Sequence, residues 1–175
     1  MRQTSAAAED PRSTFLAFYD DALPQVYGYL SARCRPRVVA EDLTAETFLA
    51  AVDAVRRDDP PPVSMPWIIG VARHKLVDYW RRQDREDRGL RGLADPDPPL
   101  PDPSDTYLDA VQARQTLDEL AAPHRAALTL RYLDDLPVAE VAALLGRTVH
   151  ATEALLVRAR AAFRQAYREE EVDDG

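Results

Sequence analysis

The residues of this sequence that could do chemistry are three histidines, a group of carboxylates and two arginine-rich runs. His74, His124 and His150 lie far apart, and none has a Cys or an acidic partner at the spacing of a metal-ligand set. The sequence contains neither a glycine-rich phosphate loop nor a nucleophile elbow. We therefore expect no enzymatic activity, no cofactor and no metal site.

The carboxylates gather near the start of a predicted helix that spans residues 41–57. Glu41, Asp42 and Glu46 lie where the helix dipole favours negative charge. They could in principle hold a divalent ion, but no second carboxylate-rich helix complements them. Acidic residues at this position most often stabilise the helix itself, and a partner-binding face is the alternative.

The first arginine-rich run lies on a helix predicted from Trp67 to about Arg85. Its apolar stripe consists of Ile68, Val71, Ala72, Leu76 and Tyr79. Its other side carries Arg73, His74, Lys75, Arg81 and Arg82 and ends in Trp80. Aromatic rings among cations suit single-stranded nucleic acid, because bases stack on the rings while the cations hold the backbone. A solvated charged face with core aromatics is an equally good interpretation.

The second run belongs to three predicted helices between Leu120 and about Arg168. We expect Gly146 to end the second helix in a left-handed conformation and Thr148 to cap the third. Pro137 is predicted at the first position of the second helix. In the first helix Leu128, Leu130, Tyr132 and Leu133 are predicted to bury one face. This order is typical of a helix-turn-helix, whose last helix enters the major groove. An ordinary helical hairpin fits the spacing equally well, but the last segment concentrates cations: Arg147, Arg158, Arg160, Arg164 and Arg168.

Two proline clusters divide the chain, and the predicted fold is all-α with two small helical domains. We expect a first domain at 12–88, an acidic Pro-rich linker at 89–106, a second domain at 107–168 and a disordered acidic tail at 169–175. The first helix is predicted from Phe15 to Ala32, with Pro24 as a possible kink. Its predicted buried residues are Phe15, Phe18, Tyr19, Leu23, Val26, Tyr27 and Leu30.

A net charge of −8 argues at first against nucleic-acid binding. The charge is unevenly distributed, however: residues 12–88 hold 12 basic and 12 acidic groups, and residues 107–168 hold 8 and 7. Because local patches rather than the total charge steer a protein onto DNA, weak binding by the chain alone is the expectation. No apolar run is long enough to span a membrane, so a cytoplasmic location without membrane insertion is predicted. The single Cys34 excludes a disulfide within the chain.

Three segments in this order resemble the extracytoplasmic-function sigma factors of bacterial RNA polymerase. They are AEDLTAETF from Ala40 to Phe48, WIIGVARHKLVDYWRR from Trp67 to Arg82, and the stretch from Leu128 to Arg160. The resemblance implies a transcription initiation factor that binds core RNA polymerase and promoter DNA. It implies a four-helix first domain that melts the −10 element and a helix-turn-helix domain that reads the −35 element. The implied partners are the clamp of the largest polymerase subunit, the flap of the second subunit and an anti-sigma factor.

The resemblance also carries residue roles onto this chain. For core polymerase binding it implies Asp42, Leu43, Glu46 and Phe48. For −10 DNA it implies a group on and before the third helix: Ser64, Met65, Trp67, Arg73, His74, Lys75, Tyr79, Arg81 and Arg82. For −35 DNA it implies Arg147, Thr148, His150, Ala151, Glu153, Ala154, Arg158 and Arg160.

The chain departs from the family pattern at several of these places. Ala45 stands where Gln is common, and Glu153 and Leu155 stand where Lys and Arg are common. A glutamate can accept a hydrogen bond from cytosine N4 but repels phosphate, so we expect an atypical −35 sequence or weak −35 dependence. Two other functions remain open: a freestanding helix-turn-helix regulator that binds duplex DNA without polymerase, and an adaptor that uses residues 41–55 without reading DNA.

Overall fold

The computed structural model describes residues 11–90 and 110–173, and within these ranges the chain is helical with no β-strand. The all-α prediction is therefore confirmed. Contacts group the chain into two compact units, Met1–Leu76 and Val77–Gly175, and the division falls inside the third helix. The predicted domain limits remain a prediction, since residues 91–109, most of the expected linker, lie outside the described ranges.

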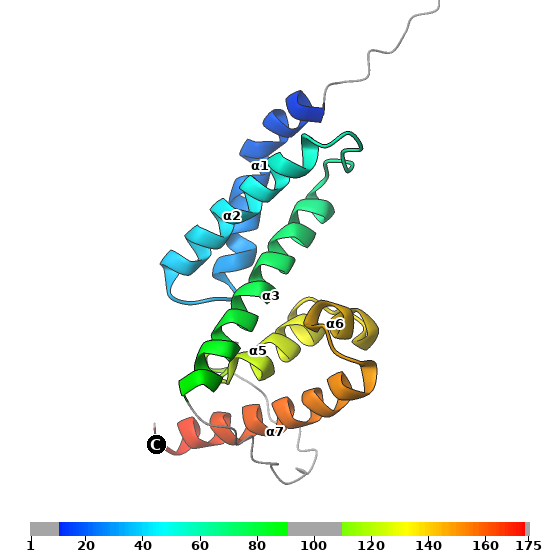
Figure 1. Cartoon of the computed structure of the whole chain (residues 1–175). Coiled ribbons are helices and arrows are strands. Elements are labelled where there is room, and N and C mark those ends of the chain that lie inside the picture. The colour runs from blue at the N-terminus through cyan, green and yellow to red at the C-terminus, as the bar shows by residue number, and fades with distance from the viewer. Residues whose placement is uncertain (1–10, 91–109, 174–175) are drawn as a thin grey trace, which may run out of the picture. The chain divides into compact units, whose positions relative to one another are not determined.

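The first unit is built on two helices that run antiparallel, α1 (Pro11–Ser31) and α2 (Arg37–Val55) (Figure 1). Phe15, Ala22, Val26 and Leu30 form the buried stripe of α1 at helical spacing. On α2 two buried threonines lie among the apolar residues, and each donates its hydroxyl proton to the carbonyl four residues earlier. These bonds are 2.6 Å from Thr44 to Ala40 and 2.7 Å from Thr47 to Leu43, so neither hydroxyl is buried without a partner.

Helix α3 (Met65–Leu90) continues from the first unit into the second. Its buried residues recur at every fourth position, Ile68, Ala72, Leu76 and Trp80, with Val77 beside them. Residues at this spacing lie on one face of a helix. Trp80 therefore does not lie with the cations, and the alternative of a core aromatic is confirmed for this residue, which is 2% exposed.

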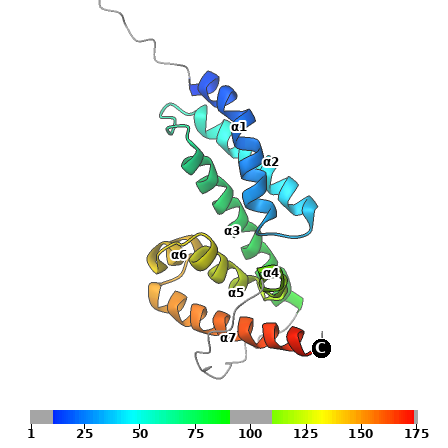
Figure 2. The same cartoon turned by 180° about the vertical axis from the view of Figure 1, so that it is seen from behind.

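The second unit adds α4 (Ala110–Glu119), α5 (Ala122–Leu128), the π-helical turn η1 (Thr129–Leu133), α6 (Val138–Leu145) and α7 (Val149–Asp173) (Figure 2). Helix α7 packs against α4, α5 and α6. The central cluster of this unit packs α5, and Leu120 just before it, against α7. Its six buried residues are Leu120, Ala127, Leu128, Leu155, Leu156 and Ala159.

Several boundaries differ from the predicted ones. Helix α2 begins at Arg37, so Glu41 and Asp42 lie one turn further from its N-terminus than expected. Pro137 is the N-cap of α6 rather than its first residue. Helix α7 extends to Asp173 through the predicted disordered tail, where successive glutamates are good helix formers. Between residues 11 and 90 the structure contains three helices, not the four that the resemblance implied.

Three predicted core residues are on the surface. Tyr19 of α1 is 36% exposed and contacts the edge of Phe48 at 4.7 Å between ring centroids. Tyr132 and Leu133 are 52% and 49% exposed, whereas Leu128 and Leu130 are buried as predicted. The π-helical turn explains this difference, because its wider turn rotates Tyr132 and Leu133 away from the direction of Leu128.

Gly146 adopts φ 63° and ψ 38°, which confirms the left-handed end predicted for α6. A side chain in this conformation is strained by about 1–2 kcal/mol. We therefore predict that Gly146→Ala lowers the stability of the second unit by about that amount, measured by chemical denaturation followed through the buried Trp80.

Gly28→Ala is the matched control, because Gly28 lies inside α1 and an added Cβ there meets no atom within 4 Å. Alanine should raise the stability of the first unit by about 0.5–1 kcal/mol, since glycine is unfavourable inside a helix. Equal effects of the two substitutions would contradict the role given to the turn.

Candidate nucleic-acid and partner interfaces

The outer face of α2 carries Asp42, Ala45, Glu46 and Leu49, which the helix places in one line at successive turns. Leu49 is 67% exposed, more than Val38, the other exposed large hydrophobic residue of this helix. The sequence analysis missed Leu49, although its position one heptad after Asp42 could have indicated it. The surface is thus an acidic stripe with an exposed leucine, and we call it the α2 outer face.

The predicted core polymerase-binding residues divide between this face and the core. Asp42 is exposed and Glu46 is half-buried, but Leu43 and Phe48 are only 2% and 7% exposed. The two buried residues can therefore support the α2 outer face but cannot form its contact surface. That Leu43 and Phe48 contribute to polymerase binding stays a prediction, and the contribution would come from supporting the α2 outer face.

An ion pair links the α2 outer face to α3. The Lys75 Nζ lies 3.7 Å from a Glu46 carboxylate oxygen, and both side chains are partly exposed. A pair of this kind contributes little stability, about 0–1 kcal/mol. Its significance is that a residue assigned to −10 DNA and one assigned to polymerase are adjacent.

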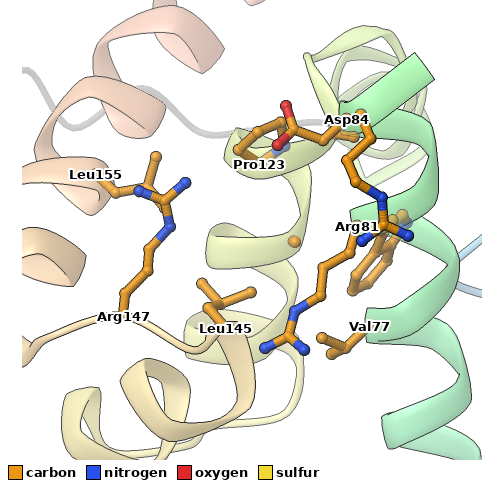
Figure 3. A pocket seen from close by; sticks show the side chains of 11 residues that line it. Val77, Arg81, Asp84, Pro123, Leu145, Arg147 and Leu155 are labelled. Atoms are coloured by element: carbon orange, nitrogen blue, oxygen red, sulfur yellow. The ribbon is translucent and has the colours of Figure 1, made fainter. Parts of the chain in front are cut away.

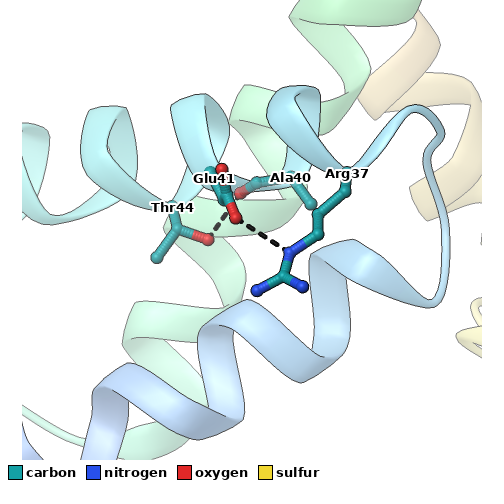
Figure 4. A network of polar contacts seen from close by, with 4 residues as sticks. All are labelled: Arg37, Ala40, Glu41 and Thr44. Carbon is teal, nitrogen blue, oxygen red and sulfur yellow. Dashed lines mark hydrogen bonds and ion pairs between the residues drawn. The ribbon is translucent and has the colours of Figure 1, made fainter.

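A second polar contact borders a groove between α1 and α2. The Arg37 Nε donates to a Glu41 carboxylate oxygen at 2.9 Å, one helical turn away, beside the Thr44 hydrogen bond (Figure 4). This hydrogen bond, together with charge interactions with Tyr27 and Glu41, raises the pKa of the Arg37 guanidinium above its ordinary value. The groove has a volume of about 510 Å³ and is lined mainly by apolar groups of Tyr19, Leu23, Pro24, Tyr27 and Phe48.

The residues assigned to −10 DNA lie on α3 or immediately before it, but they fall into both units. Ser64 caps the helix, since its hydroxyl accepts a hydrogen bond of 3.4 Å from the Trp67 amide. His74 is exposed, and Trp67 remains partly exposed, so a ring and a polar side chain are accessible in the first unit. The others there, Met65, Arg73 and Lys75, are half-buried.

The remaining −10 residues, Tyr79, Arg81 and Arg82, lie in the second unit. The Tyr79 hydroxyl accepts a hydrogen bond of 2.8 Å from Gln83, and Arg82 is exposed. Arg81 is occupied: its guanidinium donates to the Leu144 carbonyl at the end of α6.

Arg81 lines a cavity of about 230 Å³ within the second unit (Figure 3). The figure shows Arg81 and Val77 on α3 facing Leu145 and the side chain of Arg147. The cavity is part of the packing of the second unit. Arg81 is thus engaged in the packing of the second unit, whereas the accessible −10 residues Trp67 and His74 belong to the first unit.

The helix-turn-helix consists of α6, the turn at Gly146 and α7. The Thr148 hydroxyl accepts a hydrogen bond of 3.1 Å from the Ala151 amide, which confirms the predicted cap. Four residues of α7 share one outward side: His150, Glu153, Val157 and Arg160. We call this line of residues the α7 outer face.

The other residues assigned to −35 DNA surround this face. Arg147 and Thr148 are exposed, and Ala151 and Ala154 are partly exposed. Arg158 is half-buried, and its Nε is buried without a hydrogen-bond partner among the described residues. The sequence analysis missed Val157, which is 37% exposed between Glu153 and Arg160, where an apolar group can contact a thymine methyl.

The described ranges contain no group of three or more His, Cys, Asp or Glu residues placed to hold a metal ion. No helix in these ranges is long and apolar enough to cross a membrane.

Comparisons with known proteins identify the class. The family model for Sigma-70 region 2 matches residues 18–86, and the model for Sigma-70, region 4 matches residues 110–163. The sequence is 31% identical over 130 residues to the RNA polymerase sigma factor CarQ of Myxococcus xanthus, and the match covers 70% of this chain and 71% of CarQ. It is 32% identical over 126 residues to the ECF RNA polymerase sigma factor SigC of Mycobacterium tuberculosis, covering 71% of this chain and 68% of SigC.

A third relative, the ECF RNA polymerase sigma factor BldN of Streptomyces coelicolor, is 27% identical over 164 residues; the match covers 91% of this chain but only 62% of BldN. The sigma factor RpoE of Bartonella quintana, solved in complex with the anti-sigma factor NepR, shares the fold with a TM-score of 0.55 at 18% identity. That match covers 89% of this chain and 98% of RpoE. The chain belongs to the sigma-70 family of RNA polymerase sigma factors, a class of transcription initiation factors. Within the family it is an extracytoplasmic-function sigma factor.

The cap of α7 allows a direct test of how the N-terminus of this helix is stabilised. We predict that Thr148→Ala lowers the stability of the second unit by about 1 kcal/mol, because the Ala151 amide loses its acceptor. Thr148→Ser keeps the oxygen and should unfold close to the parent protein in thermal denaturation. If serine and alanine destabilise equally, the hydroxyl is not the stabilising group.

Proposed function

We propose that this sigma factor binds core RNA polymerase through the α2 outer face and reads the −35 element through the α7 outer face. The −10 element is melted and held by the accessible residues around His74 and Trp67 on α3. The observation that carries the proposal is the α7 outer face, a capped helix after a left-handed glycine turn with polar and cationic side chains facing outward.

The two parts of α7 support different kinds of DNA contact. A helix in the major groove places residues near its N-terminus against base edges, while cations further along bind the phosphate backbone. On α7 His150 and Glu153 lie near the N-terminus, and Arg158 and Arg160 lie beyond them. This order supports direct readout of base edges by His150 and Glu153, and phosphate contacts by Arg158 and Arg160 that position α7 on the duplex.

Opening the −10 element requires an accessible ring and polar groups rather than bond chemistry. Unstacking a base costs a few kcal/mol, which stacking and hydrogen bonding in a pocket can offset. Trp67 and His74 supply these groups in the first unit. Because Arg81 is bound to the Leu144 carbonyl, its assignment to −10 DNA requires that this hydrogen bond break.

The proposed partners are the clamp of the largest polymerase subunit for α2, the flap of the second subunit for the helix-turn-helix domain, and an anti-sigma factor. The relative RpoE was solved with an anti-sigma factor, which supports the last of these. The apolar groove between α1 and α2 offers a surface on which such a partner could bury area.

The polymerase-binding face is tested by charge reversal. Asp42→Arg/Glu46→Arg should reduce retention of purified core RNA polymerase by at least about tenfold, since hot-spot residues of an interface contribute on this scale. The measurement is the affinity of the full-length chain for core polymerase in a binding titration.

Asp20→Arg/Asp21→Arg makes the same change of charge on exposed residues of α1 and is the matched control. If both variants bind core polymerase equally well, the α2 outer face is not the contact. Retention of duplex DNA by the chain alone, with no affinity for polymerase, would favour the freestanding regulator instead.

The −35 reading is tested at Glu153, which is exposed on the α7 outer face. We predict that Glu153→Ala relaxes discrimination at one base pair of the selected promoters, where a lost base contact costs about 1–3 kcal/mol. The measurement is the set of start sites that the holoenzyme selects from a library of promoter fragments. Glu140→Ala, an exposed acid on α6, is the control, and identical selections by both variants would exclude base reading by Glu153.

A further inference from the structure

Tyr132 was predicted to be a core residue but is exposed, and it is not among the residues assigned to −35 DNA. It lies on η1 with about half of its surface exposed, while its neighbour Leu130 is fully buried. The Arg160 Nη1 donates a hydrogen bond of 3.3 Å to the Tyr132 hydroxyl oxygen. The Arg131 guanidinium lies 5.7 Å from the centre of the Tyr132 ring.

The hydrogen bond leaves two kinds of donor side by side on the surface. A tyrosine oxygen that accepts from an arginine keeps its own proton for another acceptor. The guanidinium of Arg160 has five N–H donors, of which the bond to Tyr132 uses one. The pair therefore presents a cation and a neutral O–H donor to any anion that approaches it.

The spacing along α7 indicates which anion that is. Arg160 lies about 15 Å beyond His150 along the helix axis, at a rise of about 1.5 Å per residue. The major groove is about 12 Å wide. A helix that places His150 at the base edges therefore brings Arg160, and Tyr132 with it, to the phosphate backbone that borders the groove.

We propose that Tyr132 and Arg160 together bind one backbone phosphate of the −35 duplex, with the Tyr132 hydroxyl donating to one oxygen and the guanidinium to another. The proposal rests on the proposed reading of duplex DNA by α7. Tyr132 is thus a DNA-positioning residue on η1, the turn that precedes α6, and its contact would fix where α7 lies against the phosphate backbone.

The experiment is an NMR titration of the isotope-labelled full-length chain with a short DNA duplex of mixed sequence, repeated over a series of salt concentrations. A phosphate contact does not depend on sequence, and NMR detects weak binding. We expect the Tyr132 ring signals to shift on addition of duplex. Tyr132→Phe should weaken binding about three- to tenfold, the effect of one hydrogen bond.

The salt dependence separates a direct contact from a structural one. Because Tyr132 is neutral, Tyr132→Phe should leave the slope of log affinity against log salt unchanged, whereas Arg160→Ala should reduce it by about 0.9. The double variant should lose less than the two single losses combined, since both side chains bind the same phosphate. Tyr19→Phe, which removes an exposed hydroxyl from the first unit, should bind like the parent.

Three outcomes would overturn the proposal in different ways. If Tyr132→Phe binds like the parent while Arg160→Ala is weakened, Tyr132 does not bind phosphate, and the proposed function stands. If Tyr132→Phe also reduces the salt slope, the tyrosine acts only by holding Arg160. If the parent chain shows no duplex-dependent shifts at low salt, the proposed DNA reading by α7 is itself wrong.

Discussion

The packing of α5 against α7 is the contact on which the α7 outer face depends. Ala127 and Ala159 are fully buried there, and such small residues allow the two helix axes to approach closely. Leu155 and Leu156 fill the space around them. Because consecutive residues of a helix differ by about 100° in direction, burying this side of α7 turns the opposite side to solvent. The α7 outer face is therefore a consequence of the core rather than of the polar residues themselves.

The first unit uses the same physical rule with a different result. Helix α2 buries a broad side that includes two threonines, whose hydroxyls are satisfied by carbonyls of their own helix. No polar partner from another helix is needed, so α2 can pack on α1 without specific side-chain hydrogen bonds between them. Among its exposed residues is the α2 outer face, on which two acids flank an alanine and precede a leucine. Acidic and partly apolar, this face suits contact with another protein better than contact with nucleic acid.

The electrostatics of the molecule fit a factor that works only in combination with polymerase. With a net charge of −8 and the exposed Glu153 on α7, the chain is expected to attract DNA weakly on its own. Glu46 holds Lys75 at 3.7 Å, and the Leu144 carbonyl holds Arg81, so two cations of α3 already have protein partners. Two weak DNA contacts can together give strong binding to one promoter when a larger assembly holds the two contact surfaces at a fixed distance. The second contact is then intramolecular and benefits from a high effective concentration.

The sequence by itself determined the elements whose causes are local. Gly146 ends α6 and Thr148 caps α7 because backbone conformation and capping depend on the residue at that position. The three motifs were sufficient to identify the sigma family. Only the tertiary structure decided which side of each element faces outward. Leu43, Phe48 and Trp80 are buried, whereas Leu49, Tyr132 and Val157 are exposed, although all six are apolar or aromatic residues within helical patterns. A pattern read along the chain cannot show which of two possible sides finds a partner helix, or that a π-helical turn rotates Tyr132 towards Arg160, because both depend on contacts between segments distant in sequence.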